Sequence, residues 1–536
     1  MMNENNYKSI PKEKFEFANL GGKIHDAKFE DKPIGYFKDA WIRFRKNKAS
    51  IVASLIIVFI ILFSIFAPLF NPQYDSTFLD PYYAKKGPKN VWLGENLGIM
   101  DGNVSRTASE RGLWWLAAVG MGAEDTTESL ASNKKNTVKD GMASYYSPLN
   151  EYKEAGMGPD GKQRFDVGVD TYLEVGFIYK EVTQDEYKKI LAWQEESGIQ
   201  VLYPKIENNQ YYYPNSVTVD NPANYWFKSN NKGDPIKVSV DSEGNVTEKK
   251  ISLKDNATLE DNYKRDAEGN LVYWDYIGGG TQETAQYEIR VLYYNYYIYQ
   301  NGFEPNYLFG TDSQGYDLAL RMADGIRLSL LVSVCVCAIN FFIGAIYGAV
   351  AGYYGGAVDL IMERITDILS GIPSIVVMTL FQMHFAHKVG VIPSLLFAFV
   401  LTGWIGMASR VRTQFYRFKN QEYVMAARTL GARDRRIIWK HIFPNTLGTI
   451  ITGSVLAIPG VIFTESMLSF LGIVNLGGQE TTSLGTLLSD ASSIWTNYPH
   501  LMLFPALVIA LLMISFNLFG NGLRDAFNPS LRGVED

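Results

Sequence analysis

The chain has 536 residues, of which 47% are hydrophobic and 20% are charged, and its formal net charge is −6. These averages are those of a soluble protein, but several windows of about 20 apolar residues exclude a wholly soluble chain, because each is long enough to cross a bilayer core. Residues 71–310 carry about 35 acidic and 24 basic side chains, whereas the remainder has an excess of about five bases. The sequence therefore predicts an acidic segment inserted into a mildly basic membrane protein.

Residues 1–48 are predicted to form a cytoplasmic tail that ends in a surface helix. The polar residues before position 35 are expected to be only partly ordered. Phe37, Trp41 and Phe44 then recur at helical spacing with basic residues between them, which is typical of a short helix lying on a membrane. The first span is predicted at 49–70, and we do not expect it to be a cleavable signal peptide. Basic residues crowd its start, so the N-terminus is expected in the cytoplasm.

Residues 71–306 are predicted to form an inserted domain on the outer side of the membrane. About 24 of the 33 tyrosines lie there and need burial, which favours a folded module over a disordered linker. Alternating apolar residues predict strands near 237–240 and 271–274, and a helix is predicted over 183–196. We therefore expect a β-rich α+β domain that is stable without disulfides, since this segment has no cysteine.

Two near-copies in this segment, DSEGN at 241–245 and DAEGN at 266–270, each lie between strand-like runs. Gly and Asn supply the positive φ that tight hairpins need, so hairpin turns are predicted. A calcium loop is the alternative, but the glycine falls at the wrong offset for an EF-hand loop.

Five further spans are predicted in the second half of the chain. With six spans both termini lie in the cytoplasm, and so does the loop 409–445 between spans four and five. This loop has many more Lys and Arg than Asp and Glu, which agrees with the positive-inside rule. The five predicted spans are 326–353, 358–384, 391–408, 446–471 and 501–518.

The loop 409–445 contains a pattern that predicts a compact knob. Two small residues allow close approach on a helix, a glycine permits a sharp turn, and a proline after the second helical run predicts the start of the next span. Another protein can grip such a helix-turn-helix, although an ordinary basic loop is the plainer interpretation. The residues of the pattern are Glu422, Ala426, Ala427, Gly431, His441 and Pro444.

This spacing resembles the EAA loop of ABC importer permeases. One position departs from the family pattern, because Met425 stands where many relatives have the first glutamate and Glu422 lies one turn earlier. The resemblance implies that the loop docks in a groove of an ATPase subunit and transmits closure of the ATP sites to the membrane helices.

A second motif, before span two, resembles the segment LGTDxxGRD of peptide and nickel permeases. Tyr316 replaces the arginine that is usual there, which puts any role of that arginine in doubt. The residues that carry this motif are Gly310, Thr311, Asp312, Gly315 and Asp317.

A third motif covers 516–529 and places Arg524 and Asp525 at the cytoplasmic mouth of the last span. The lead-in 32–48 resembles the N-terminal tail of the C-type subunit of oligopeptide permeases. The combined resemblance covers 1–70 and 307–536, so the inserted domain is the departure from shorter family members.

Polar residues inside the predicted spans have two interpretations. Glu465 and Ser466 lie near the middle of span five, where an ionised carboxylate costs about 2.5 kcal/mol or more unless it faces protein or water. Glu465 either lines the translocation path or makes an interhelical hydrogen bond, and the sequence does not separate the two. Arg364 and Asp367 are spaced i,i+3 and are expected to pair with each other. Cys335 and Cys337 diverge on a helix, so we expect two small core residues.

The chain lacks the G-x-x-x-x-G-K-[ST] loop that cradles ATP, and it has no nucleophile motif and no metal-ligand cluster. We expect a non-catalytic permease subunit that binds no cofactor itself, with ATP and Mg²⁺ on separate ATPase subunits. The predicted fold is an all-α membrane protein with six transmembrane helices of the type I ABC importer permease fold, plus the β-rich α+β insert.

The resemblance implies an oligopeptide importer in a bacterial cell membrane, with import of dipeptides, nickel or another small solute as the alternative. The implied partners are a homologous second permease, two ATPases, an extracytoplasmic peptide-binding protein and the lipid bilayer, without nucleic acid. A competing hypothesis from a different functional class is a membrane-anchored surface receptor whose binding module is the insert.

Overall fold

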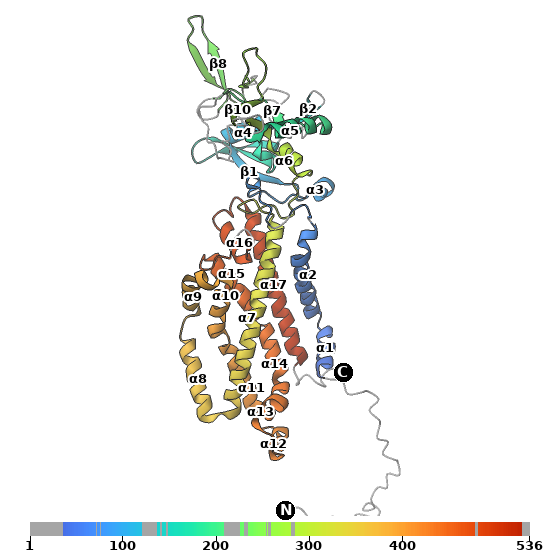
Figure 1. Ribbon diagram of the computed structural model, residues 1–536, viewed down its shortest axis with the longest axis vertical. Coiled ribbons are helices and arrows are strands. Elements are labelled where there is room, and N and C mark those ends of the chain that lie inside the picture. Colours follow the sequence, from blue (N-terminus) through green and yellow to red (C-terminus); the bar gives the residue numbers. More distant parts are fainter. Residues whose placement is uncertain are drawn as a thin grey trace, which may run out of the picture.

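A computed structural model describes residues 36–70, 72–74, 77–120, 137–139, 142–145, 148–207, 226–229, 234–252, 255, 259–279, 285–476 and 481–527. The predictions for residues 1–34 and for the motif residues Asn528 and Pro529 lie outside these ranges. Figure 1 shows an elongated molecule in which a bundle of long helices carries a mixed domain of sheets and helices at one end.

Within the described ranges, the bundle contains five helical stretches that are long and apolar enough to cross a membrane, or six if one bent pair counts as a single span. The first is α2 (Lys48–Phe70), close to the predicted 49–70. The short helix α1 (Tyr36–Lys46) precedes it as predicted, and its Phe44 packs edge-on against Phe519 of α17 with ring centroids 5.4 Å apart. The later helices are α7 (Leu318–Tyr354), α8 (Gly356–Ser370), α9 (Ser374–Val389), α10 (Val391–Gly403), α11 (Ile405–Phe418), α12 (Glu422–Thr429), α13 (Asp434–Arg436), η6 (Ile437–Ile442), α14 (Phe443–Val455), α15 (Ile458–Phe470), α16 (Leu484–Ala491) and α17 (Pro499–Phe527).

The predicted span 358–384 is not one continuous helix. The chain bends by 70° between α8 and α9. The bend follows from Pro373, because proline disfavours a helical conformation in the residue before it and has no N–H to continue the helix. The structure therefore divides the single predicted helix into two helices with a sharp bend between them.

The start of the fifth span, predicted at Pro444, does not coincide with the start of a helix. The helical stretch runs from Asp434 to Phe470, and Pro444 lies inside it, in the first turn of α14. A π-helical turn, η6, ends two residues before this proline. Such a wide turn tolerates a residue that lacks a backbone N–H, so the helix continues where the sequence predicted a boundary.

Small residues bring α7 and α11 into close contact. Gly344, Gly348 and Gly352 recur every four residues along α7 and face α11. A Cβ at Gly348 would overlap the carbonyl oxygen of Ala408, and one at Gly352 would lie 2.7 Å from the carbonyl oxygen of Arg412. Because glycine has no Cβ, the two backbones approach more closely than larger residues would permit.

The mixed domain contains two main antiparallel sheets, with strand orders β1-β5-β4 and β10-β11-β6. Helix α4 (Glu110–Gly120) packs beside the first sheet and buries Trp114 and Leu116 in one core. The remaining helices are α3 (Val91–Leu97), α5 (Gln184–Ser197) and α6 (Tyr293–Asn301). The strands are β1 (Asn103–Ser109), β2 (Thr137–Lys139), β3 (Met142–Tyr145), β4 (Leu149–Met157), β5 (Gln163–Asp170), β6 (Phe177–Thr183), β7 (Leu202–Tyr203), β8 (Ile236–Val240), β9 (Val246–Lys250), β10 (Trp274–Gly278) and β11 (Gln286–Leu292).

The predicted helix, the two hairpin turns and one of the two predicted strands, β8, are found in this domain. Helix α5 starts after Thr183, whose hydroxyl accepts a hydrogen bond from the N–H of Glu186. Gly244 and Gly269 both have positive φ, at +83° and +87°, in the two predicted hairpin turns. The strand predicted at 271–274 is shifted, since β10 begins at Trp274.

A tyrosine-rich core joins the mixed domain to the membrane helices. The rings of Tyr74, which follows α2, and Tyr307, which precedes α7, are stacked with centroids 4.6 Å apart. The same cluster of buried side chains includes Tyr83 and Tyr297 of the mixed domain together with Leu320 of α7. The domain therefore shares a core with the ends of α2 and α7, which is where its tyrosines are buried.

Candidate functional site

Helix α12 forms a knob at the end of the bundle opposite the sheets (Figure 1). Val424 and Ala427 are buried on one of its faces, and Val424 joins the same core as Val411 of α11. Met425 is half exposed, and Leu430 is 88% exposed. One face of the helix thus fixes it to the bundle, while the other presents apolar side chains that are free to contact another protein.

Gly431 ends α12 in a well-defined turn. The N–H of Ala432 donates to the carbonyl of Ala427, and the N–H of Gly431 donates to that of Arg428, each at 3.0 Å. These two bonds define a Schellman motif, which needs a left-handed residue at the glycine position. The φ of Gly431 is +81°, so the glycine predicted to allow a sharp turn does so by its backbone conformation.

The other predicted loop residues occupy different surroundings. Glu422 and Ala426 are exposed on α12, His441 is half-buried in η6, and Pro444 is exposed in α14. The knob is held to the next helix by a hydrogen bond of 3.2 Å from the Asn445 amide to the Tyr423 hydroxyl. The structure thus places the six predicted residues on one helix-turn-helix unit without gathering them into a single cluster.

An arginine clamp lies between α8 and α11, beside the knob. Arg412 donates to both oxygens of Asp359, at 2.5 and 2.6 Å, and to both oxygens of Glu363, at 2.9 and 3.0 Å. Tyr416 donates to Asp359 as well, at 2.6 Å. Bidentate pairs of this kind fix orientation as well as distance, so α8 and α11 are held in register. The predicted pair of Arg364 and Asp367 is confirmed at 2.9 Å.

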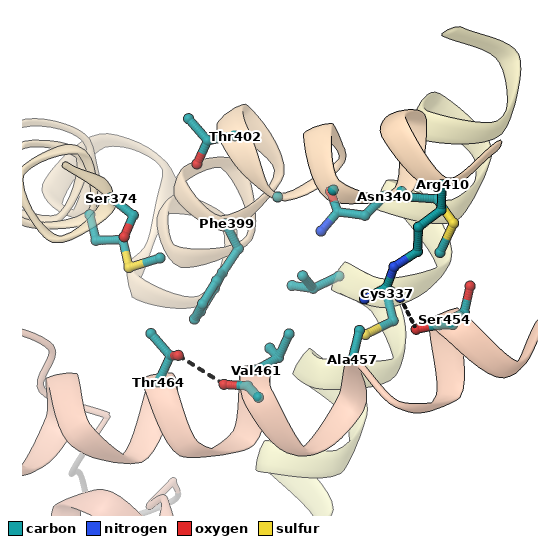
Figure 2. Close-up of a pocket in the computed structure, with 17 residues that line it drawn as sticks. Cys337, Asn340, Ser374, Phe399, Thr402, Arg410, Ser454, Ala457, Val461 and Thr464 are labelled. Atoms are coloured by element: carbon teal, nitrogen blue, oxygen red, sulfur yellow. Dashed lines mark hydrogen bonds between the residues drawn. The ribbon is translucent and has the colours of Figure 1, made fainter. Parts of the chain in front are cut away.

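A cavity of about 420 Å³ lies inside the bundle, between α7, α9, α10–α11 and α14–α15 (Figure 2). Its walls are mostly apolar or small, with Met378, Phe399 and Val461 among the larger side chains. Among the polar side chains that line it are Asn340 from α7 and Arg410 from α11, which the sequence did not single out as site residues. From the sequence, Arg410 was only one of the basic residues of the loop 409–445, because no local pattern distinguishes it from the other arginines there.

Glu465 does not line this cavity, although its neighbour Thr464 does. Its side chain is buried and accepts hydrogen bonds from Ser329 of α7 at 2.9 Å and from Ser469 at 3.1 Å. Ser466 is buried beside it. Of the two interpretations of Glu465, the interhelical hydrogen bond is the one for which the structure provides a partner.

The motif before α7 holds the start of the mixed domain. Thr311 accepts a hydrogen bond from the N–H of Lys86 at 2.8 Å, and Asp312 accepts three from the backbone of residues 314–316 at 2.9 to 3.0 Å. A Cβ at Gly310 or Gly315 would overlap the carbonyl oxygens of residues 86 and 80, respectively. The motif is therefore a backbone clamp.

The remaining motif residues form the helix ends. Asp317 caps α7 by accepting a hydrogen bond from the N–H of Ala319 at 2.8 Å. Tyr316 is buried, and the guanidinium carbon of Arg321 lies over its ring, 4.7 Å from the ring centroid. Arg524 and Asp525 are both exposed near the end of α17 and lie 3.8 Å apart. Among the described residues, no group of three His, Cys, Asp or Glu side chains is placed to hold a metal ion.

Two family models match the chain. Residues 310–533 match the binding-protein-dependent transport system inner membrane component, and residues 35–88 match the N-terminal TM domain of oligopeptide transport permease C. The segment between these matches contains nearly all of the mixed domain.

Curated relatives match part of the chain. The oligopeptide transport system permease protein OppC of Bacillus subtilis is 43% identical over 229 residues, which cover 42% of this chain and 72% of the relative. The dipeptide transport system permease protein DppC of the same organism is 45% identical over 226 residues, 42% of this chain and 69% of the relative. OppC of Haemophilus influenzae is 43% identical over 230 residues, 43% of this chain and 72% of the relative.

Among solved structures, inward facing MetNI methionine ABC transporter shares 15% identity, with a TM-score of 0.33 and coverage of 39% of this chain and 96% of that chain. At this TM-score the likeness carries no weight for the fold.

Proposed function

The chain belongs to the oligopeptide and dipeptide permeases of the binding-protein-dependent, or ABC, transport systems, and on that premise we propose that it forms one half of the translocation pathway of an ATP-driven oligopeptide importer. The proposed assembly adds a homologous second permease, two ATPase subunits and an extracytoplasmic peptide-binding protein. ATP and Mg²⁺ bind to the ATPases in this assembly, and this chain contributes no catalytic residue.

The observation that supports coupling is the knob of α12. Its buried face is continuous with the core of α7 and α11, and its exposed face carries Met425 and Leu430. A displacement applied to this helix by an ATPase would therefore pass directly to two helices that line the cavity. The Arg412 clamp extends the same rigid contact to α8.

The proposed mechanism is alternating access. The loaded binding protein docks on the outer side, ATP closes the two ATPase subunits, and the knob transmits that closure so that the pathway opens outward. ATP hydrolysis then returns the pathway to the inner side. In this arrangement both termini and the knob are cytoplasmic and the mixed domain is extracellular, in a multi-pass protein of the bacterial cell membrane.

For the mixed domain we propose a role at the outer mouth, where it enlarges the docking surface for the binding protein or caps the vestibule. The shared tyrosine core supports this role, because it joins the domain to the outer ends of α2 and α7. Oligopeptides are favoured over nickel or other solutes because the relatives named above are oligopeptide and dipeptide permeases.

The test is uptake of a labelled peptide by cells that lack the gene, complemented with the full chain. We expect complementation to restore uptake, and purification of the tagged chain to bring ATPase subunits with it. If the protein were instead a surface receptor, no ATPase would co-purify with it, and complementation would leave peptide uptake unchanged.

A further inference from the structure

The cavity between α7, α9, α10–α11 and α14–α15 has an unusual charge pattern. Of the described residues that line it, Arg410 is the only one with a formal charge, and none is acidic. The lining is otherwise apolar, small or neutral and polar, as in many ligand sites where a few polar groups fix orientation. A cation on the wall of such a cavity points to an anionic group that enters it.

Arg410 differs in this respect from the arginine nearest to it. Arg412 is neutralised by Asp359 and Glu363, whereas no carboxylate of the described residues lies within 4 Å of Arg410. The one hydrogen bond that Arg410 makes within the described chain goes from Nη1 to the carbonyl oxygen of Gly453, at 3.1 Å. A guanidinium has five N–H donors, so most of them remain available to a ligand.

The bond to Gly453 has a local cause. In a continuous helix this carbonyl would accept from the N–H of Ala457, but at the junction of α14 and α15 that N–H donates to Ser454 instead. Arg410 therefore reaches from α11 to a carbonyl that the helix break exposes (Figure 2). This contact orients the guanidinium in the cavity without neutralising its charge.

Asn340 provides a second, independent observation. Its side chain is only 9% exposed and lines the same cavity, yet its Oδ1 has no hydrogen-bond partner in the described part of the chain. A Cβ at Gly403 would overlap its amide group, so glycine is what allows Asn340 to occupy this position. Buried acceptors are normally satisfied, and an unpartnered one in a cavity is explained if a ligand N–H binds it. If Arg410 served only to cap α14 at the carbonyl of Gly453, the unpartnered Oδ1 of Asn340 would remain unexplained.

We propose that this cavity binds the C-terminal residue of the transported peptide, with the terminal carboxylate at the Arg410 guanidinium and the last peptide N–H at Asn340 Oδ1. The apolar walls around Met378, Phe399 and Val461 then face the side chain of that residue. A carboxylate one residue away from an amide donor is what distinguishes a peptide end from a peptide interior. This inference rests on the proposed function.

The test compares uptake of two peptides of one sequence, one with a free C-terminal carboxylate and one with a C-terminal amide, in cells that contain the native partner subunits. The measured quantity is the uptake of the peptide with the free carboxylate divided by the uptake of the peptide with the amide. The binding protein is the same in every strain, so its own preference affects this ratio equally in all variants. We expect Arg410→Gln to lower this ratio about tenfold, because it removes a charge-assisted hydrogen bond. Arg410→Lys should retain most of the ratio, and the control Arg364→Gln, which removes an exposed charge outside the cavity, should leave it unchanged.

A second pair of peptides tests Asn340. Asn340→Leu should reduce uptake of the ordinary peptide but not of a peptide whose last amide nitrogen is methylated and has no N–H to donate. If Arg410→Gln does not reach the membrane, Arg410→Lys and Asn340→Leu decide the question. Equal losses for both members of each pair would show that the two residues are only structural and would overturn the proposal. Failure of the wild type to take up any of the peptides would instead reject the proposed function.

Discussion

The backbone N–H of Lys89 donates a hydrogen bond of 2.8 Å to the carbonyl oxygen of Tyr307, and the two residues form an antiparallel bridge. This bridge closes the base of the mixed domain. The chain before it, at 79–89, pairs with the motif at 311–317. We therefore propose that the inserted module begins near residue 90 and that residues 71–89 belong to the permease core.

Replacement of residues 90–306 by a short Gly-containing turn tests this boundary. Because Lys89 and Tyr307 already lie opposite each other, such a turn can connect them without moving α2 or α7. We expect the shortened chain to insert in the membrane and to bind the ATPases, but to lose peptide uptake or capture of the binding protein. Detergent-solubilised complexes and labelled-peptide uptake provide the measurements. Normal uptake by the shortened chain would contradict a role for the module in transport.

Gly431→Val should uncouple the knob. The added Cβ meets no atom within 4 Å, so the effect comes from the backbone, where a left-handed β-branched residue costs about 1–2 kcal/mol. We expect the variant to reach the membrane but to retain less ATPase in pull-down assays and to lose uptake. Gly431→Asn is the matched control, since asparagine tolerates the same φ, and it should behave almost as the wild type. Unchanged uptake by Gly431→Val would argue against the coupling role.

Gly348→Ala should destabilise the bundle. Its Cβ would lie 2.8 Å from the Cβ of Val411 and would overlap the carbonyl oxygen of Ala408, so α7 and α11 would have to separate. Overpacking of this kind costs about 1–3 kcal/mol. The midpoint of thermal unfolding in detergent should fall, whereas Gly406→Ala, at a helical glycine with open space around it, should leave it unchanged. Equal midpoints for the two variants would refute this account of the packing.

Ser329→Ala tests whether Glu465 serves packing. The substitution removes the 2.9 Å hydrogen bond between α7 and α15, and the loss of one such bond to a buried acceptor costs about 1–3 kcal/mol. We expect a lower unfolding midpoint together with an unchanged ratio of acid to amide peptide uptake. A changed ratio would instead favour the interpretation that Glu465 lines the translocation path.

The tyrosine-rich core at the base of the mixed domain should unfold in alkali. Burial raises the pKa of Tyr74 and Tyr296 to about 12, and it raises the pKa of Tyr293 and Tyr297 further, whereas an exposed tyrosine ionises near 10. The folded state therefore holds more protons than the unfolded state above pH 10, and stability falls as the pH rises from there. Below pH 10 these groups contribute no pH dependence. Tyrosinate absorbance and circular dichroism, recorded in one alkaline titration, should change together.

A gradual ionisation of these tyrosines near pH 10, without loss of circular dichroism, would show that their burial is not as described.

Several features of this protein could be predicted from the sequence because they depend on neighbouring residues. The first span follows from one uninterrupted apolar window, and α5 follows from Thr183 as a cap. The hairpin turns at Gly244 and Gly269 and the turn at Gly431 follow from the positive φ that glycine tolerates.

The features that only the tertiary structure decided depend on residues far apart in the chain. The bend between α8 and α9 and the continuous helix through Pro444 depend on how neighbouring turns adjust around a proline, which hydropathy does not record. Asn340 and Arg410 enter one cavity because α7 and α11 pack at a stripe of glycines, and nothing in either local sequence marks them as partners. The sequence by itself determined the apolar windows of the long helices and the turn at Gly431, since hydropathy and backbone φ are local properties. The cavity and the closure of the module at Lys89 and Tyr307 required the fold, because long-range packing creates them.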